Sequence, residues 1–229
     1  MKLRILSWNV RGQMTETRRL IKDVIKSQKA DLVCLQETKI QKMSNGMVKS
    51  LEVGRCLEWE AAGGVVVFWD NRVLQLVEME VGKFIVSCRF KNCENGFYWC
   101  FSGVYGPTVK VEREDFWSEL GAIRGLWNGP WCVAGDFNMI RFPFERSRGG
   151  RLSPTMRRFS EVVEELELRD LPLQGGCSRG VEVSIIGQSQ ELIVSLFLRI
   201  GKLIFRGLSK LYWLGWFLIT LRFFLTGEE

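Results

Sequence analysis

Polar side chains stand where several apolar, strand-like runs of the sequence end, and these residues are the best placed to do chemistry. Asn9 closes one such run, Glu37 a second and Tyr105 a third, while Asp136 and Asn138 follow a fourth. Strand ends are where sandwich and α/β folds present functional side chains. A single Asp or Glu at a strand end is ordinarily a solvated turn residue, so the prediction rests on all of these positions together.

The absence of histidine restricts the chemistry that these residues could perform. With no histidine among 229 residues, neither a Ser-His-Asp nor a Cys-His nucleophile is possible, and no metal can be bound by imidazole. Acid–base chemistry must therefore come from Asp, Glu, Lys, Tyr or Cys, or from a bound metal. The seven cysteines form no CxxC pair, which argues against a zinc site and favours buried, reduced thiols in an intracellular protein.

Length and composition indicate a globular chain with one main domain. Hydrophobic residues make up 46% of the sequence and charged residues 25%, which excludes disorder as the main state. The net charge of +6 is compatible with a polyanionic partner, although such a charge can equally serve solubility alone. The first residues lack the pattern of a signal peptide.

Strands and helices are predicted to alternate along the first part of the chain, which is typical of an α/β fold. Apolar runs predict strands at 3–10, 31–37, 63–69, 73–80, 83–91, 97–105 and 131–135. Apolar residues at helical spacing predict helices at 14–29, capped by Thr15, at 116–126, and at 154–168, where Pro154 lies just inside the first turn.

Six motifs in order resemble the endonuclease/exonuclease/phosphatase family, and more narrowly the endonuclease domain of plant non-LTR (LINE-type) retrotransposons. The motifs are ILSWNVRG, DLVCLQETK, GGVVVFWD, VYGP, WCVAGDFN and DLPLQGG, and they span residues 1–176. The resemblance implies an α/β fold of four layers, an α-β-β-α sandwich that is incomplete at its C-terminus here. It also implies hydrolysis of phosphodiesters with a divalent metal ion.

The resemblance assigns a role to each polar strand end. Glu37, with Asn9 beside it, would hold Mg²⁺ or Mn²⁺ through oxygen. Asp136 would orient and deprotonate the attacking water, Asn138 would fix that water or the phosphate, and Tyr105 would donate to a phosphate oxygen.

DNA is the partner that the resemblance implies, bound through its phosphate backbone and without a small-molecule cofactor. Arg141, Arg146 and Arg148 follow the GDFN motif and could contact that backbone. A solvated basic loop is the alternative for these three residues. The family implies a location in the nucleus or cytoplasm, and the sequence defines no oligomeric state.

The family's last strands are missing after Gly176, although the chain continues for 53 residues. The family ends in a strand carrying Ser-Asp-His, preceded by Phe-Thr-Trp and Arg-Ile-Asp-Arg-Phe segments. Residues 217–226 permit a coding that, read from the last base of the Phe217 codon, spells Ser-Asp-His-Phe-Ala-Ile-Leu-Leu-Asp. The same offset recovers Phe-Thr-Trp from 177–180 and Arg-Ile-Asp-Arg-Phe from 190–195. These matches predict a one-nucleotide frame offset that begins near Cys177.

A frame offset divides the chain into a truncated domain, 1–176, and an out-of-frame apolar tail, 177–229. Loss of the final strands predicts unpaired sheet edges on the domain and no defined fold for the tail. Loss of the histidine and of the other late site residues predicts an impaired enzyme, at a cost of about 10²–10³ in rate for each lost group that stabilises the transition state.

Four interpretations therefore remain open. The chain is an inactive endonuclease relic, or an enzyme with weak Mg²⁺-dependent hydrolysis, or a nucleic-acid-binding module without catalysis. The fourth is a tail-anchored membrane protein, since residues 211–225 are strongly apolar. That stretch is short of the roughly 20 apolar residues of a spanning helix and contains Arg222, which argues against a membrane.

Overall fold

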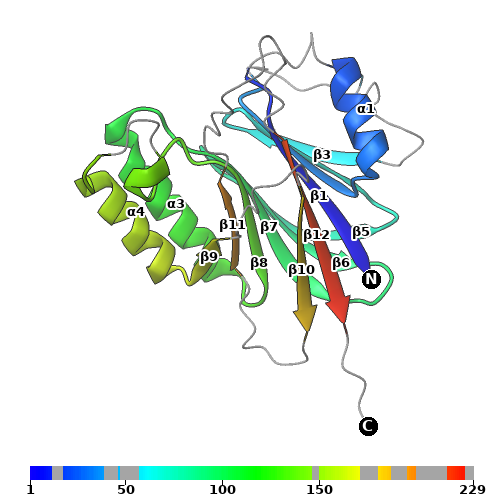
Figure 1. Cartoon of the computed structure of the whole chain (residues 1–229). Coiled ribbons are helices and arrows are strands. Elements are labelled where there is room, and N and C mark those ends of the chain that lie inside the picture. Colours follow the sequence, from blue (N-terminus) through cyan, green and yellow to red (C-terminus); the bar gives the residue numbers. More distant parts are fainter. Residues whose placement is uncertain are drawn as a thin grey trace.

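Two six-stranded sheets pack face to face, and helices cover their outer faces (Figure 1). The computed structural model describes residues 1–11, 18–38, 46, 57–145, 150–170, 180–186, 195–199 and 216–224, the last three segments as backbone only. The arrangement confirms the predicted α-β-β-α sandwich.

The first sheet contains the strand–helix–strand unit with which the chain opens. Its order is β10-β12-β1-β2-β4-β3, and the parallel pairing of β1 with β2 brings the carboxyl ends of these strands to one edge. Apolar residues of helix α1 (Arg18–Gln28), among them Ile21 and Ile25, are buried against its outer face. The strands are β1 (Lys2–Asn9), β2 (Leu32–Gln36), β3 (Leu57–Ala62), β4 (Val65–Asp70), β10 (Gly180–Ile186) and β12 (Trp216–Phe224).

The second sheet has the order β5-β6-β7-β8-β11-β9. Strands β7 and β8 are parallel, with Tyr105 opposite Asp136 at their carboxyl ends. Helices α3 (Arg113–Leu126) and α4 (Pro154–Glu165) cover the outer face, and the 3-10 turns η1 (Lys110–Glu112) and η2 (Pro143–Glu145) lie in the connecting loops. The strands are β5 (Leu74–Val81), β6 (Ile85–Asn92), β7 (Tyr98–Tyr105), β8 (Trp131–Asp136), β9 (Leu168–Asp170) and β11 (Ser195–Arg199).

The core between the sheets consists of aliphatic, aromatic and thiol side chains. Ile5 and Val67 of the first sheet and Phe101 of the second are fully buried there. Cys34 and Cys132 lie in the same core as free thiols, and burial raises the pKa of each to about 12. The prediction of buried, reduced thiols is confirmed for these two cysteines.

Most predicted elements are present, and their ends differ for local reasons. Helix α4 begins at Pro154 as predicted, and the Ser153 hydroxyl caps it by accepting the Met156 N–H at 3.3 Å. It ends at Glu165 rather than 168, because Glu167 adopts a left-handed conformation (φ 55°) and Leu168 begins β9. The first helix spans Arg18–Gln28, and the predicted Thr15 cap lies outside the described residues.

Part of the tail forms strands, although no defined fold was predicted for it. β12 pairs antiparallel with β1, and β11 pairs with β8, so the predicted unpaired edges are filled at these two strands. Ladder hydrogen bonds use backbone groups, which any strand-forming segment supplies, and residues 216–224 are rich in aromatic and β-branched residues. No helix in the described part of the chain is long and apolar enough to cross a membrane.

Candidate active site

The predicted polar residues meet where the carboxyl edges of the two sheets come together. Asn9 ends β1 of the first sheet, and Asp136 ends β8 of the second. The Asn9 side-chain amide Nδ2 donates to Asp136 Oδ2 at 2.8 Å, across the gap between the sheets. This hydrogen bond joins residues 127 positions apart, so the cluster exists only in the folded chain.

Asp136 accepts a second hydrogen bond from its own loop. The Asn138 backbone N–H donates to Asp136 Oδ1 at 2.9 Å, and the Asn138 side-chain amide donates to the Gly106 carbonyl at 2.7 Å. Asn138 has φ 52°, a left-handed conformation that asparagine tolerates better than most residues. The Asn138 amide therefore ties the loop after β8 to the loop after β7.

Two glycines shape the loops around this cluster. A Cβ at Gly106 would collide with the Phe137 carbonyl, and Gly106 N–H donates to the Asp136 carbonyl at 2.7 Å. Gly64 (φ 84°) lies 4.0 Å from the Glu37 Cα and 3.6 Å from the Tyr105 ring, measured from the position that its Cβ would take. These would be ordinary contacts for a Cβ, so glycine is favoured at 64 by its φ of 84°, which few residues with a side chain adopt.

Glu37 lies half-buried directly after β2. Its φ of 53° is uncommon for a residue with a side chain, and the next residue is fixed by a hydrogen bond from Thr38 N–H to the Gly64 carbonyl at 3.1 Å. Within the described residues, no hydrogen bond or ion pair engages the Glu37 carboxylate.

The surroundings of Asp136 favour its protonated form. Burial raises the pKa of its carboxyl, and the nearby negative charge of Glu37 adds to this effect. The hydrogen bonds from Asn138 and Asn9 and the positive charge of Arg11 act in the opposite direction. The balance leaves the Asp136 pKa above its ordinary value, the direction that suits a general base working near neutral pH.

The Tyr105 phenol is near enough to Glu37, Asn138 and Asp136 for all three to act on its pKa. Burial raises the pKa of the phenol and the charge of Glu37 raises it further, while a hydrogen bond with the Asn138 side chain lowers it. Because the pKa lies above the ordinary value, the phenol keeps its proton at neutral pH and can donate a hydrogen bond.

The sequence that contains this site matches the profile of a known family. The endonuclease/exonuclease/phosphatase family profile matches residues 6–159. The chain belongs to this family. No curated protein matches the sequence.

Solved structures of the family share the fold. The endonuclease domain of TRAS1, a telomere-specific non-LTR retrotransposon, is 13% identical with a TM-score of 0.56, and the match covers 72% of this chain and 73% of that one. A family protein from Bacteroides thetaiotaomicron is 16% identical with a TM-score of 0.50, over 60% and 64% of the two chains. Humanized D. rerio TDP2 is 17% identical with a TM-score of 0.47, over 61% and 67%. The matches thus span between 64% and 73% of the length of these three chains.

The donor set fits the divalent metal ion that members of the family typically use. Glu37 provides a carboxylate with no partner among the described residues. Asn9 provides its amide oxygen, which accepts the Arg11 N–H at 2.9 Å and has a second lone pair for a metal, while its amide nitrogen bonds to Asp136. Within the described residues, no three His, Cys, Asp or Glu side chains form a metal-binding group. A site of one carboxylate and an amide suits Mg²⁺, which usually keeps several waters and binds few protein carboxylates.

The predicted arginines are not part of this cluster as far as the structure describes them. Arg141 lies against α4, where its guanidinium donates to the Ser160 hydroxyl at 3.3 Å and lies 3.5 Å from a Glu164 carboxylate oxygen. Its side chain is only 14% exposed, so it supports the loop after β8 in this structure. Arg146 and Arg148 lie outside the described residues.

Sequence reasoning missed three contributors to the cluster. The Arg11 backbone N–H donates to the Asn9 side-chain oxygen Oδ1 at 2.9 Å, and the Arg11 charge acts on Asp136. Gly106 allows the loops after β7 and β8 to approach closely, and Gly64 allows the left-handed turn between β3 and β4. Both glycines lie in quoted motifs, and the signal in the sequence was the glycine itself, since a glycine inside a motif indicates a positive φ or a close backbone contact.

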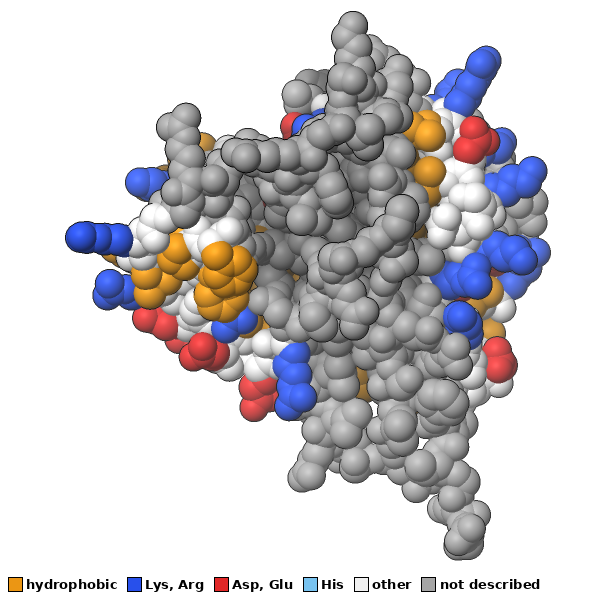
Figure 2. Space-filling model, viewed as in Figure 1, with side chains coloured by type: hydrophobic (Ala, Val, Ile, Leu, Met, Phe, Trp, Pro, Cys, Tyr) orange, Lys and Arg blue, Asp and Glu red, His pale blue; other side chains and the backbone are white. Residues whose placement is uncertain are grey.

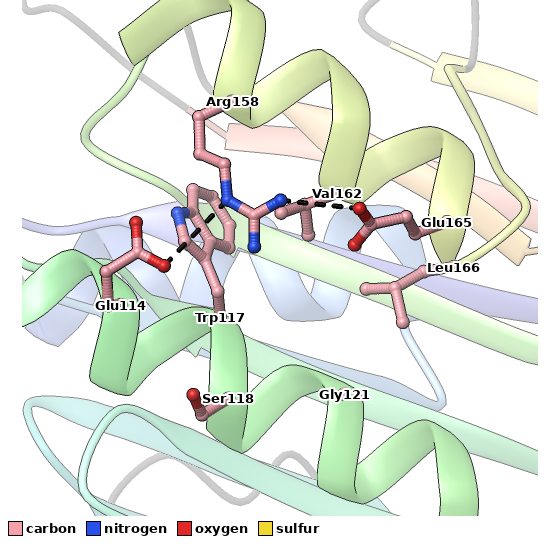
Figure 3. Close-up of a pocket in the computed structure, with 8 residues that line it drawn as sticks. All are labelled: Glu114, Trp117, Ser118, Gly121, Arg158, Val162, Glu165 and Leu166. Carbon is pink, nitrogen blue, oxygen red and sulfur yellow. Dashed lines mark hydrogen bonds and ion pairs between the residues drawn. The ribbon is translucent and has the colours of Figure 1, made fainter.

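A groove of about 130 Å³ between α3 and α4 lies apart from this cluster (Figure 3). Arg158 reaches from α4, with its guanidinium 3.8 Å from Glu114 and 3.3 Å from Glu165. The pair with Glu114 joins α4 to α3, whereas the pair with Glu165 lies within α4. The groove contains none of the residues predicted to do chemistry. It is lined by Glu114, Trp117, Ser118, Gly121, Arg158, Val162, Glu165 and Leu166.

Proposed function

We propose that the chain is a metal-dependent phosphodiester hydrolase domain of the retrotransposon endonuclease type, with impaired catalysis. The observation that carries the proposal is the Asn9–Asp136 hydrogen bond, which assembles groups from both sheets into one cluster. Hydrolysis of a phosphodiester needs neutralisation of the phosphate charge and an oriented water, and the cluster offers groups for both.

Each residue of the cluster has a role in this proposal. Glu37 and Asn9 would hold Mg²⁺, which supplies charge neutralisation at the phosphate when it is bound. Asp136 takes the proton of the attacking water, and its raised pKa supports that role. Asn138 orients the water or the phosphate, and the protonated Tyr105 phenol donates to a phosphate oxygen.

The six motifs support the retrotransposon type, with DNA as the substrate. The TRAS1 endonuclease domain shows that the same fold serves such an element. The narrower assignment rests on the motifs, since members of the family with other functions share the architecture.

Impairment follows from the residues that the tail lacks. No histidine follows Gly176, so no imidazole can support the phosphate charge in the transition state. The start of β12, Trp216, lies opposite Trp8 of β1, close to the Asn9 end, and residues 217–220 are the ones whose shifted codons spell Ser-Asp-His. The strand is thus paired at the site edge without the side chains that the family uses there.

A nicking assay with a frame-restored chain tests the proposal. We expect the native chain to nick supercoiled plasmid slowly in Mg²⁺, and a chain with one nucleotide inserted at codon 177 to nick it about 10²–10³ times faster, as for a regained oxyanion-type donor. Glu37→Ala should abolish the activity of both chains.

Two results would contradict the proposal. Activity that survives Glu37→Ala would exclude the assigned metal site. DNA binding that persists in Asp136→Ala, with no nicking by either the native or the frame-restored chain, would favour a nucleic-acid-binding module without catalysis.

A further inference from the structure

Exposed apolar side chains gather in the two loops that leave the site edge of the second sheet. Val109 and Val111 follow β7 and are 55% and 84% exposed, while Phe144 and Leu152 follow β8 and are 79% and 44% exposed. Exposed hydrophobic side chains are also visible on the α3–α4 side of the molecule in Figure 2. Single exposed apolar residues along this rim are ordinary, but Phe144 is the one aromatic ring among these four.

Phe144 forms a parallel stack with Phe142. The ring centroids are 5.3 Å apart and the planes differ by 9°. The Arg141 guanidinium lies over the Phe142 ring at 5.0 Å, and the same guanidinium is bonded to Ser160 and paired with Glu164 of α4. The stack is therefore attached to a helix through Arg141, while the ring of Phe144 lies in solvent.

The stack is close to the candidate active site along the chain. Phe144 is six residues after Asn138, so the two are at most about 20 Å apart even with an extended backbone. A nucleic acid strand with one phosphate at Asp136 could reach the ring with a base only a few nucleotides away.

We infer that Phe144, backed by Phe142, is a stacking platform for an unpaired base of the nucleic acid strand bound at the site. The choice of substrate rests on the proposed function. A flat, exposed aromatic ring accepts any base through its π face. The positive charge of the chain attracts the phosphate backbone that carries the base.

Binding of short single strands in EDTA tests the inference without requiring hydrolysis. Phe144→Ala should lower the affinity for oligodeoxythymidylate about tenfold, within the range that stacking of one base gives. The affinity for an abasic strand of equal length should stay unchanged, because that strand presents only sugar and phosphate. Phe144→Trp should keep or raise the affinity for oligodeoxythymidylate, and 2-aminopurine in the strand should be quenched by the wild type more than by Phe144→Ala.

Tyr98→Ala is the matched control. Tyr98 is 46% exposed and begins β7, at the opposite end from Tyr105, so its loss should leave binding unchanged. The inference would be overturned if Phe144→Ala lost the same affinity for both strands, or lost none for either. It would also be overturned if the wild type did not bind oligodeoxythymidylate. The last two results would favour a protein partner for this rim. Absence of nicking with normal base-dependent binding would overturn the proposed function alone.

Discussion

At the scale of single residues, the site depends on how a buried carboxylate is satisfied. Asp136 has one oxygen bonded to Asn138 and the other to Asn9, so neither oxygen is left without a donor. Burial still raises its pKa, which means that the fold stabilises the protonated carboxyl relative to the ionised one. Because the folded pKa lies above the unfolded value, this contribution to stability is complete below the unfolded pKa and is lost as pH rises through the folded pKa.

Asn9→Ala should therefore destabilise the protein in a pH-dependent way. It removes a hydrogen bond that lowers the Asp136 pKa, so that pKa should rise further and the loss of stability on ionisation should grow. We expect the free energy of unfolding to fall by about 1–3 kcal/mol at neutral pH, the cost of an unsatisfied buried or charged group. The loss should shrink at acid pH, where the carboxyl is protonated, as measured by urea unfolding in EDTA.

Asn71→Ala provides the matched control for this experiment. The Asn71 amide donates to the Glu58 carboxylate at 3.2 Å, but at an exposed position. Its loss should change stability by less than about 0.5 kcal/mol, as is usual for surface substitutions. If both variants lose the same stability at every pH, the Asn9–Asp136 bond has no special role.

At the scale of elements, the sequence predicts a strand well where it has an apolar run and poorly elsewhere. β2, β4 and β8 were foreseen because almost every residue in them is apolar and buried. β3 (Leu57–Ala62) was missed, since its LEWEAA sequence has no apolar run and mostly half-buried positions. Its pairing with β4 comes from the tertiary fold.

The sequence also predicts which residues are at the site better than it predicts their backbone conformations. Asp136 and Glu37 were identifiable because polar residues ended apolar runs. The left-handed φ of Glu37 was not, because glutamate has no preference for it and the surrounding contacts impose it. Sequence thus predicts which residues reach the edge of the sheet, while the tertiary structure decides how they point.

Helix α3 contains a glycine at a position where alanine would have the higher helix propensity. Gly121 lies in the helix interior and faces the groove of Figure 3, and nothing lies within 4 Å of the place its Cβ would take. Gly121→Ala should raise the free energy of unfolding by about 0.5–1 kcal/mol, because alanine loses less backbone entropy on folding. Thermal and urea unfolding would measure the gain.

Gly103→Ala should instead lower the free energy of unfolding. A Cβ at Gly103 would lie 2.7 Å from Cys34 Sγ and 2.9 Å from Val67 Cγ2, between the two sheets, and overpacking there should cost about 1–3 kcal/mol. A stability gain at 103 or a loss at 121 would show that the packing of the sandwich differs from this description.

At the scale of the whole molecule, the domain and its tail form one pair of sheets. On the face shown in Figure 2, Lys and Arg side chains occur on both the α1 side and the α3–α4 side, with Asp and Glu among them. The positive charge of this face is therefore spread, and binding of DNA would rely on the site rim as well as on general attraction. The tail contributes through its backbone, since β12 lies between β10 and β1.

The position of β12 makes the frame-offset hypothesis and the fold testable together. Residues Leu218–Arg222 of β12 have a neighbour on each side, so each of their N–H groups faces β10 or β1, and proline at one of these positions would remove a ladder bond. Ile219, opposite Ile5 in β1, is a suitable site. Arg4 directs its N–H and C=O to Asp31, so the next residue, Ile5, directs its own toward β12. Ile219→Pro should lower the free energy of unfolding by about 1–3 kcal/mol and weaken amide protection in β1 during hydrogen exchange, whereas the conservative Ile219→Val keeps the ladder bond and should retain that protection. An equal effect of the two substitutions would mean that residues shifted out of frame remain outside the sheet. A selective effect of proline would mean that β12 still occupies the sheet position of the family's last strand, with only its side chains changed.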